Sequence, residues 1–250
     1  MAKIITITSG KGGVGKTTTA INLAAAINSF GREVIIVDAN LATPNVGLHL
    51  GAPIVPISLN HALLGKVKIE EAIYEHESGT KIIPSSLSIG ELKRLNHGRL
   101  KDVGKRLRKM ADFVIYDSAA GLGEEAIAAI ESADELVIVT NPEIPAVTDA
   151  LKTSKLIEQL GKTVKGVIVT RVRNSKTEMP IANIKDMLEL PILGVIPEEY
   201  RVQSALVMKE ALIHAYPKCK ASREYKRIAA RLIGHDNYKD DSGFFSRLFG

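Results

Sequence analysis

Short apolar segments recur along the chain and are separated by longer segments that mix apolar and polar residues. The apolar segments are nearly continuous, as in Val-Ile-Ile-Val at residues 34–37 and Leu-Val-Ile-Val at residues 136–139. Continuous apolar runs of this length are typical of strands that are buried on both faces of a parallel sheet. We therefore expect strands at residues 3–8, 33–38, 81–84, 113–117, 135–140, 166–170 and 192–196.

The longer segments have the apolar spacing of helices. We expect helices at residues 17–30, 123–132, 146–160, 181–188 and 222–232. Alternation of strands and helices predicts an α/β fold: a doubly wound, mostly parallel sheet with helices on both faces. In such folds the ligand binds at the carboxyl ends of the strands.

The C-terminal region departs from this alternation. We expect the folded domain to span residues 1–233, and residues 234–242, which are polar and lack periodicity, to form a flexible tether. On a helix, the apolar residues Phe244, Phe245, Leu248 and Phe249 of segment 243–250 fall within an arc of about 140°, away from Arg247. This pattern predicts an amphipathic tail that becomes helical on a membrane surface. The alternative is a segment that folds back into a groove of the domain.

Composition narrows the class of protein. The chain has 250 residues, of which 45% are hydrophobic and 24% charged, as in ordinary soluble domains. We expect no signal peptide, because the first predicted strand begins at residue 3, and no apolar stretch reaches the length of a membrane span. The single cysteine, Cys219, excludes a disulfide framework and indicates a cytoplasmic protein. The formal net charge of +5 suggests an anionic partner, either nucleic acid or lipid.

Residues 10–17 read Gly-Lys-Gly-Gly-Val-Gly-Lys-Thr and match the phosphate loop G-x-x-x-x-G-K-[ST]. The predicted strand before it and the predicted helix after it are the context that this motif requires, so the predicted sheet is that of a P-loop NTPase fold. Backbone N–H groups of the loop can point at phosphate oxygens, Lys16 can reach the β- and γ-phosphates, and the Thr17 hydroxyl can bind Mg²⁺. The predicted phosphate-binding residues are Gly10, Lys11, Gly12, Gly13, Val14, Gly15, Lys16, Thr17 and Thr18.

Two aspartates follow buried strands. Asp38 ends the second predicted strand and Asp117 ends the fourth. A carboxylate at the carboxyl end of a parallel strand points toward the ligand crevice. Together with Thr17, they are the candidate Mg²⁺ ligands, and Asp117 fits the Walker B role of accepting hydrogen bonds from water bound to the metal. A helix cap is the alternative for a lone aspartate at such a position.

The second lysine of the loop, Lys11, makes the sequence resemble the deviant Walker A ATPases, the MinD/ParA family. The resemblance implies an ATP/ADP and Mg²⁺ cofactor set and a homodimer in the ATP state. It also implies that Lys11 reaches across the dimer to the nucleotide bound by the partner subunit. The alternative is a solvated surface lysine without that role. The catalytic residues that it implies are Lys11, Lys16, Asp38, Asn40 and Asp117.

The resemblance also implies nucleotide-sensing loops after the second and fourth strands. The N–H of Gly121 stands where the family senses the γ-phosphate, and Asn40 stands where MinD-type members usually have an aspartate. Because an amide orients water but accepts no proton from it, we expect slow hydrolysis. The resemblance implies that Thr170, Arg171, Pro197 and Glu198 contact the base. The family has an asparagine at the position of Thr170.

The tail separates the functions within this family. It resembles the membrane-targeting tail of MinD-type members, which implies a cytoplasmic ATPase that binds the inner face of an anionic membrane peripherally through Phe244, Phe245, Arg247, Leu248 and Phe249. The implied role is positioning the division site, with MinC- and MinE-like regulators as partners. The alternative is a ParA/Soj-type partition ATPase, which the basic stretch at residues 93–109 favours and an apolar tail disfavours. An iron–sulfur carrier is excluded, since it needs more than one cysteine.

Overall fold

The computed structural model describes residues 2–235 and 238. The predicted tail at residues 243–250 and most of the predicted tether at residues 234–242 lie outside the described residues. The described chain forms an eight-stranded sheet with the order β3-β4-β2-β5-β1-β6-β7-β8. Its strands are β1 (Lys3–Ser9), β2 (Val34–Ala39), β3 (Tyr74–Glu75), β4 (Lys81–Ile83), β5 (Phe113–Ala120), β6 (Glu135–Thr140), β7 (Val164–Val172) and β8 (Ile192–Pro197).

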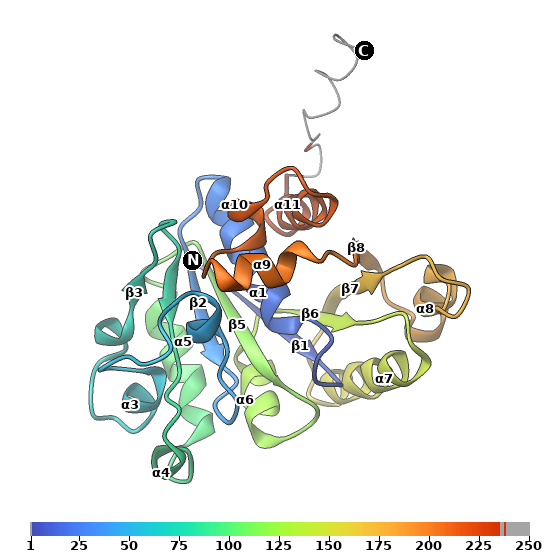
Figure 1. Ribbon diagram of the computed structural model, residues 1–250. Helices are drawn as coiled ribbons and strands as arrows, with labels where there is room; N and C mark the ends of the chain where they lie inside the picture. The colour runs from blue at the N-terminus through green and yellow to red at the C-terminus, as the bar shows by residue number, and fades with distance from the viewer. Residues whose placement is uncertain (1, 236–237, 239–250) are drawn as a thin grey trace.

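Helices connect the strands, as Figure 1 shows. They are α1 (Lys16–Ser29), α2 (Val46–His49), α3 (Leu59–Leu63), α4 (Ile89–Leu92), α5 (Leu100–Leu107), α6 (Glu124–Ser132), α7 (Ile144–Gln159), α8 (Ile181–Leu188), α9 (Arg201–Val207), α10 (Leu212–Ala215) and α11 (Lys220–Leu232), with 3₁₀ turns at Ile69–Ala72 and His97–Arg99. Among the described residues, no helix is long and apolar enough to cross a membrane.

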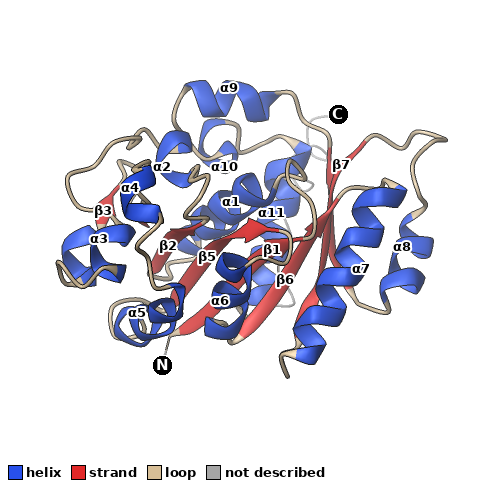
Figure 2. Ribbon diagram, turned by 90° about the horizontal axis from the view of Figure 1, so that it is seen from below, coloured by secondary structure: helices blue, strands red, loops and turns tan. Residues whose placement is uncertain are grey.

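Strand pairing is parallel everywhere in the sheet except between β3 and β4. Successive side chains of a strand point to opposite faces. In β1, Ile5 and Ile7 therefore pack against α1 and α11, whereas Ile4 packs on the other face against Leu100 and Leu107 of α5. Helices cover both faces (Figure 2), which confirms the predicted doubly wound fold and explains why the strands are apolar throughout.

The first residues after α11 are held against the domain. The ring of Tyr238 packs edge-on against Phe30, just after α1, with ring centroids 5.0 Å apart, and His235 lies 5.9 Å from the same ring. The N–H of Tyr238 donates to the carbonyl of His235. The last described residue therefore lies beside the carboxyl end of α1.

Candidate nucleotide-binding site

The loop between β1 and α1 has the backbone that the phosphate-loop motif requires. Gly13 and Gly15 have φ angles of 78° and 87°, in the left-handed region that favours glycine. A Cβ on Gly10 would lie 2.2 Å from the carbonyl oxygen of Asp149 in α7. Only glycine fits at this close approach, so α7 fixes where the loop begins.

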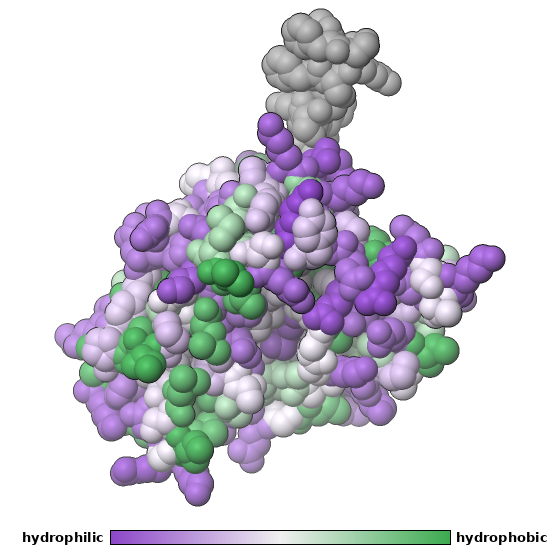
Figure 3. All heavy atoms as spheres, in the orientation of Figure 1, coloured by the Kyte–Doolittle hydropathy of each residue, from purple (hydrophilic) through white to green (hydrophobic). Residues whose placement is uncertain are grey.

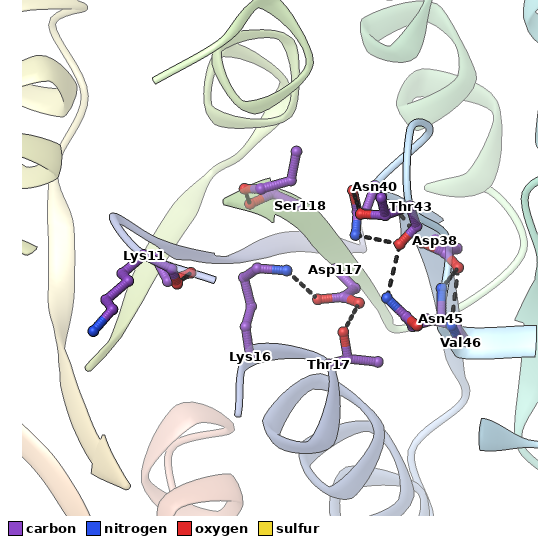
Figure 4. Close-up of polar contacts among 12 residues, drawn as sticks. Lys11, Lys16, Thr17, Asp38, Asn40, Thr43, Asn45, Val46, Asp117 and Ser118 are labelled. Carbon is purple, nitrogen blue, oxygen red and sulfur yellow. Dashed lines mark hydrogen bonds and ion pairs between the residues drawn. The ribbon is translucent and has the colours of Figure 1, made fainter. Parts of the chain in front are cut away.

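Lys16, Thr17 and Asp117 meet at the carboxyl end of the sheet (Figure 4). Lys16 Nζ lies 3.1 Å from Asp117 Oδ1, and Thr17 Oγ1 donates to Asp117 Oδ2 at 2.6 Å. The Lys16 and Asp117 side chains are buried, with 8% and 0% of their surface exposed. The structure thus brings together the predicted phosphate-binding lysine and two of the predicted metal ligands.

Asp38 completes this cluster from the neighbouring strand, since it pairs directly with Asp117 in the register of β2 and β5. Its Oδ2 accepts the backbone N–H groups of Asn45 and Val46, at 2.8 and 2.9 Å, at the start of α2. Burial, and next the negative charge of Asp117, raise the pKa of Asp38 to about 8. Burial costs the charged form and a like charge adds to that cost.

The chemistry of these side chains suits Mg²⁺. Mg²⁺ prefers oxygen ligands and is commonly held by one or two carboxylates together with substrate phosphates. Two adjacent buried carboxylates beside a threonine hydroxyl provide such a set, and a cation there would offset the repulsion between Asp38 and Asp117. Within the described part of the chain, no group of three or more His, Cys, Asp or Glu residues offers another metal site.

Asn40 lies in the loop after β2 and its amide is engaged within that loop. Its Nδ2 donates to the carbonyl of Thr43 at 2.6 Å, and its Oδ1 accepts the Thr43 hydroxyl at 3.1 Å. The Ser85 hydroxyl donates to the Asp38 carbonyl at 2.6 Å, which fixes the beginning of the loop. Asn40 is therefore next to the carboxylate cluster and also closes its own loop.

The second predicted sensing loop is tied to the phosphate loop. Gly121, with a φ of 83°, donates its N–H to the carbonyl of Ser9 at 2.9 Å. Beyond it, Glu125 of α6 accepts the N–H of Ala42 at 3.2 Å and so connects the loops after β2 and β5. Sequence reasoning did not identify Glu125, because its partner lies 83 residues away in the chain and no motif marks it.

Lys11 lies apart from the buried cluster. Its side chain is 46% exposed, and Nζ is 3.8 Å from a carboxylate oxygen of Glu143, which is 59% exposed. Glu143 belongs to the Asn-Pro-Glu segment after β6. The signature lysine is therefore at the surface beside the phosphate loop, and a weak, solvated ion pair holds it there.

Of the four predicted base-contacting residues, Arg171, Pro197 and Glu198 lie at the adjoining ends of β7 and β8, where Val172 pairs with Pro197 and the N–H of Glu198 donates to the Val172 carbonyl at 3.0 Å. Thr170 is buried beneath the phosphate loop, where its hydroxyl donates to the Val14 carbonyl at 2.6 Å and to Asn141 Oδ1 at 3.0 Å. This contact supports the loop rather than facing a base. Arg171 is exposed and has a φ of 56°.

The other two base-contacting candidates lie at the end of β8. Glu198 forms a two-pronged ion pair with Arg173, with an Nη2–Oε1 distance of 2.8 Å. Pro197 borders a groove of about 400 Å³ between β8 and α11. Sequence reasoning missed Arg173, whose only signal was its position two residues after Arg171.

The basic stretch at residues 93–109 is partly neutralised by its own fold. Arg108 pairs with Asp134 at 2.6 Å, and Lys105 pairs with Asp102 at 2.9 Å. Arg99 donates to the Leu63 carbonyl at 2.9 Å. Because these cations already have partners, part of the stretch has a structural role.

Comparison with known proteins agrees with this geometry. The CobQ/CobB/MinD/ParA nucleotide binding domain matches residues 5–212. An uncharacterized ATP-binding protein of Methanocaldococcus jannaschii is 41% identical over 94% of this chain and 89% of its own length. The septum site-determining protein MinD of Pyrococcus horikoshii, complexed with Mg-ADP, superimposes with a TM-score of 0.89 at 32% identity, covering 96% of this chain and all of that one.

A MinC:MinD cell division complex of Aquifex aeolicus matches with a TM-score of 0.86 at 28% identity, over 96% of this chain and 99% of that one. The family match spans the phosphate loop, both aspartates and the segments after β6 and β7. The chain therefore belongs to the CobQ/CobB/MinD/ParA family of nucleotide-binding proteins.

Proposed function

We propose that this protein is a Mg²⁺-dependent ATPase that dimerises around ATP, binds the membrane as a dimer and leaves it after hydrolysis. The observation that carries this proposal is the position of Lys11. A lysine at the surface beside the phosphate loop can reach a nucleotide in a second subunit. A cation supplied in trans stabilises charge on the transferring phosphoryl group only when two subunits meet.

Exposed apolar side chains on three separate elements support a face for the second subunit. Leu48 (46% exposed) lies on α2, which holds Asp38. Leu122 follows Gly121, and Ile144 follows Glu143. Apolar side chains around a polar site are typical of a reversible protein–protein interface.

The buried cluster supports the ATPase activity. Lys16 would neutralise the β- and γ-phosphates, while Thr17, Asp38 and Asp117 would hold Mg²⁺. Mg²⁺ supplies positive charge that offsets the negative charge of the phosphates. Asn40 lies beside this cluster and can orient the attacking water through its amide, so we expect slow turnover.

Membrane binding is proposed from the sequence of residues 243–250. One short apolar tail holds a bilayer weakly and reversibly, whereas two tails on one dimer act at a high effective concentration. ATP-driven dimerisation would therefore drive membrane binding. The MinD relative and the MinC:MinD complex support a role in positioning the division site with a MinC-like partner. A MinE-like activator is proposed from the resemblance of the sequence alone.

Co-sedimentation with anionic vesicles tests this proposal. The full chain and a chain ending at Asp241 are compared in ATP and in ADP. We expect the full chain alone to bind, and only in ATP. Binding in neither nucleotide would overturn the membrane cycle. The partition ATPase, which the basic stretch at residues 93–109 favours, would then become the leading function, and retention on DNA would test it.

A further inference from the structure

The final helix of the domain, α11, carries a stripe of basic side chains along its outer side. Lys220, Arg223, Arg227 and Arg231 fall within an arc of about 80° on the helix. The buried residues of α11, which include Tyr225, lie on the opposite side against the sheet and α1. From Lys220 to Arg231 the stripe runs about 16 Å along the helix axis.

Lys220 and Arg231 carry the positive charge of this stripe that the side chains of α11 itself do not neutralise. Glu224 is the one acidic residue of α11, and it pairs with Arg227. Arg231 donates to the carbonyl of Leu193 at 2.5 Å, which anchors the side chain without neutralising it. Lys220, Arg227 and Arg231 are exposed. The stripe therefore keeps a net positive charge at the surface.

A groove of about 400 Å³ runs beside the stripe. Its apolar wall is Val172, Val195 and Pro197, and its basic wall is Lys220, Arg223 and Arg227, with Asn174 and Glu224 at the margin. Cations next to an apolar recess suit an amphipathic ligand with an anionic head better than they suit a fully polar one.

The last described residue of the chain, Tyr238, lies near the end of α11, because its N–H donates to the carbonyl of His235, whose own N–H donates to the carbonyl of Ala230. Tyr238 is held against Phe30, and five residues of chain separate it from Phe244, the first apolar residue of the tail. The six Cα-to-Cα steps from Tyr238 to Phe244 span at most about 21 Å. Figure 3 shows hydrophilic side chains around the end of α11. A tail inserted into a bilayer therefore keeps α11 within reach of the headgroups.

We propose that this stripe is a docking surface for anionic phospholipid headgroups and forms the second membrane contact beside the tail. The inference rests on the proposed membrane cycle. A single apolar anchor binds marginally, and stable attachment needs a second signal such as a basic patch. Each basic side chain near an anionic bilayer raises affinity about fivefold.

Nucleic acid is the competing partner for a basic surface. The basic stretch that includes α5 is equally cationic, yet it packs on the face of the sheet opposite to α11. Of these two basic surfaces, the α11 stripe is the one that lies near Tyr238, the last described residue before the predicted tail. The observations therefore favour lipid over nucleic acid.

The test compares two triple variants of the full chain in ATP. Lys220→Gln/Arg227→Gln/Arg231→Gln neutralises the stripe, and Lys101→Gln/Lys105→Gln/Arg106→Gln removes the same charge from exposed positions of α5. Sedimentation uses vesicles of phosphatidylcholine alone and mixed with phosphatidylglycerol, over a range of salt. We expect the stripe variant to lose at least tenfold in affinity for the anionic vesicles, with a shallower salt dependence, and the α5 variant to match wild type.

Each other outcome is informative. Equal affinity of the two variants would overturn the lipid surface while leaving the membrane cycle intact, whereas a wild-type chain that binds no vesicle would overturn both. Loss of ATP affinity in the stripe variant would assign the groove to the nucleotide, and selective loss of DNA retention would assign the stripe to nucleic acid. If the glutamine variant fails to fold, a variant that keeps the charge is measured instead, Lys220→Arg/Arg227→Lys/Arg231→Lys. The proposal requires that this variant retain vesicle binding.

Discussion

Asp38 and Asp117 are paired residues of two neighbouring parallel strands, so the sheet itself holds two buried carboxylates side by side. Backbone N–H groups of α2 stabilise Asp38, while Lys16 and Thr17 contact Asp117. Burial disfavours the charged form of Asp38, and repulsion from the adjacent Asp117 adds to that effect, so the pKa of Asp38 is raised. The same repulsion favours a cation at this position.

Lys16 supplies positive charge to this cluster, so Lys16→Gln should affect both activity and stability. We expect it to abolish ATP turnover and to lower the free energy of unfolding by about 2–4 kcal/mol, because it leaves buried charge without a partner. Phosphate release and urea unfolding measure the two effects. Adding Asp117→Asn should restore much of the stability but no turnover. Wild-type turnover in Lys16→Gln would refute the assignment of the phosphate loop.

Asn40 permits a test of how the attacking water is positioned. We expect Asn40→Asp to raise the turnover rate by about three- to tenfold, below the usual effect of a general base because phosphoryl transfer has a loose transition state. The substitution also removes the N–H donor to Thr43, so the loop will open more easily. Single-turnover hydrolysis measures the rate, with Asn40→Ala as the slower control. An unchanged or lower rate in Asn40→Asp contradicts this role.

The sequence predicted the buried strands and the longer helices, but α5 (Leu100–Leu107) was not among the predicted helices although Leu100, Val103 and Leu107 have helical spacing. Continuous apolar runs located seven strands to within a few residues, but β3 (Tyr74–Glu75) escaped because two residues have no periodicity. The helix α2 was missed for a different reason. It is four residues long and begins where Asp38 accepts two of its N–H groups, a contact that depends on the tertiary fold.

The candidate site likewise combines contacts that the sequence predicted with contacts that depend on the tertiary fold. The motif placed Lys16, Thr17 and Asp117 together, because each position is fixed by a strand end or by the loop. The sequence could not show that Thr170 supports Val14, nor that Glu125 contacts Ala42. Those contacts depend on how distant strands register and on where α6 packs.

The hydrogen bonds to Asp134 predict how the free energy of unfolding depends on pH. Asp134 accepts the N–H of Ile4 at 2.8 Å and a hydrogen bond from Arg108 at 2.7 Å. Partial burial disfavours its charge, but the Arg108 and Ile4 hydrogen bonds outweigh burial and lower the pKa of Asp134. Since the folded state favours the carboxylate, its stabilising effect is present above the unfolded pKa of about 4 and is lost as pH falls through the lower folded pKa.

We therefore expect Asp134→Asn to lower the free energy of unfolding by about 1 kcal/mol at pH 7, after allowance for solvent screening of this half-exposed pair. The difference from wild type should shrink as the pH falls below about 4. Urea unfolding across this range measures it. Asp102→Asn, at an exposed pair of α5, is the matched control and should change stability little. A deficit that grows toward acid pH would contradict the sign argued from the pKa.

Thr170 distinguishes support of the phosphate loop from recognition of the base. Thr170→Val keeps the shape but removes the hydroxyl that donates to Val14 and Asn141. We expect weaker binding of ATP and GTP by the same factor, about tenfold, because an unsatisfied buried carbonyl loosens the loop for every nucleotide. Equilibrium binding of both nucleotides measures this, and Thr170→Ser should restore it. A loss of affinity for ATP but not for GTP would assign Thr170 to recognition of the base.

Substitution of Lys11 tests whether the catalytic site is formed by one chain or by two. Its exposed side chain lies 3.8 Å from Glu143 and outside the buried cluster, so Lys11→Ala should leave the affinity of the monomer for ATP within about twofold of wild type. The variant should nevertheless form no ATP-dependent dimer and should show no turnover, because the partner's nucleotide lacks its second cation. Light scattering in ATP and in ADP measures the dimer. Glu143→Gln frees Lys11 without removing it and should keep dimerisation, which separates loss of the cation from loss of the ion pair. An intact ATP-dependent dimer of Lys11→Ala would remove the trans role and, with it, the link between nucleotide and membrane.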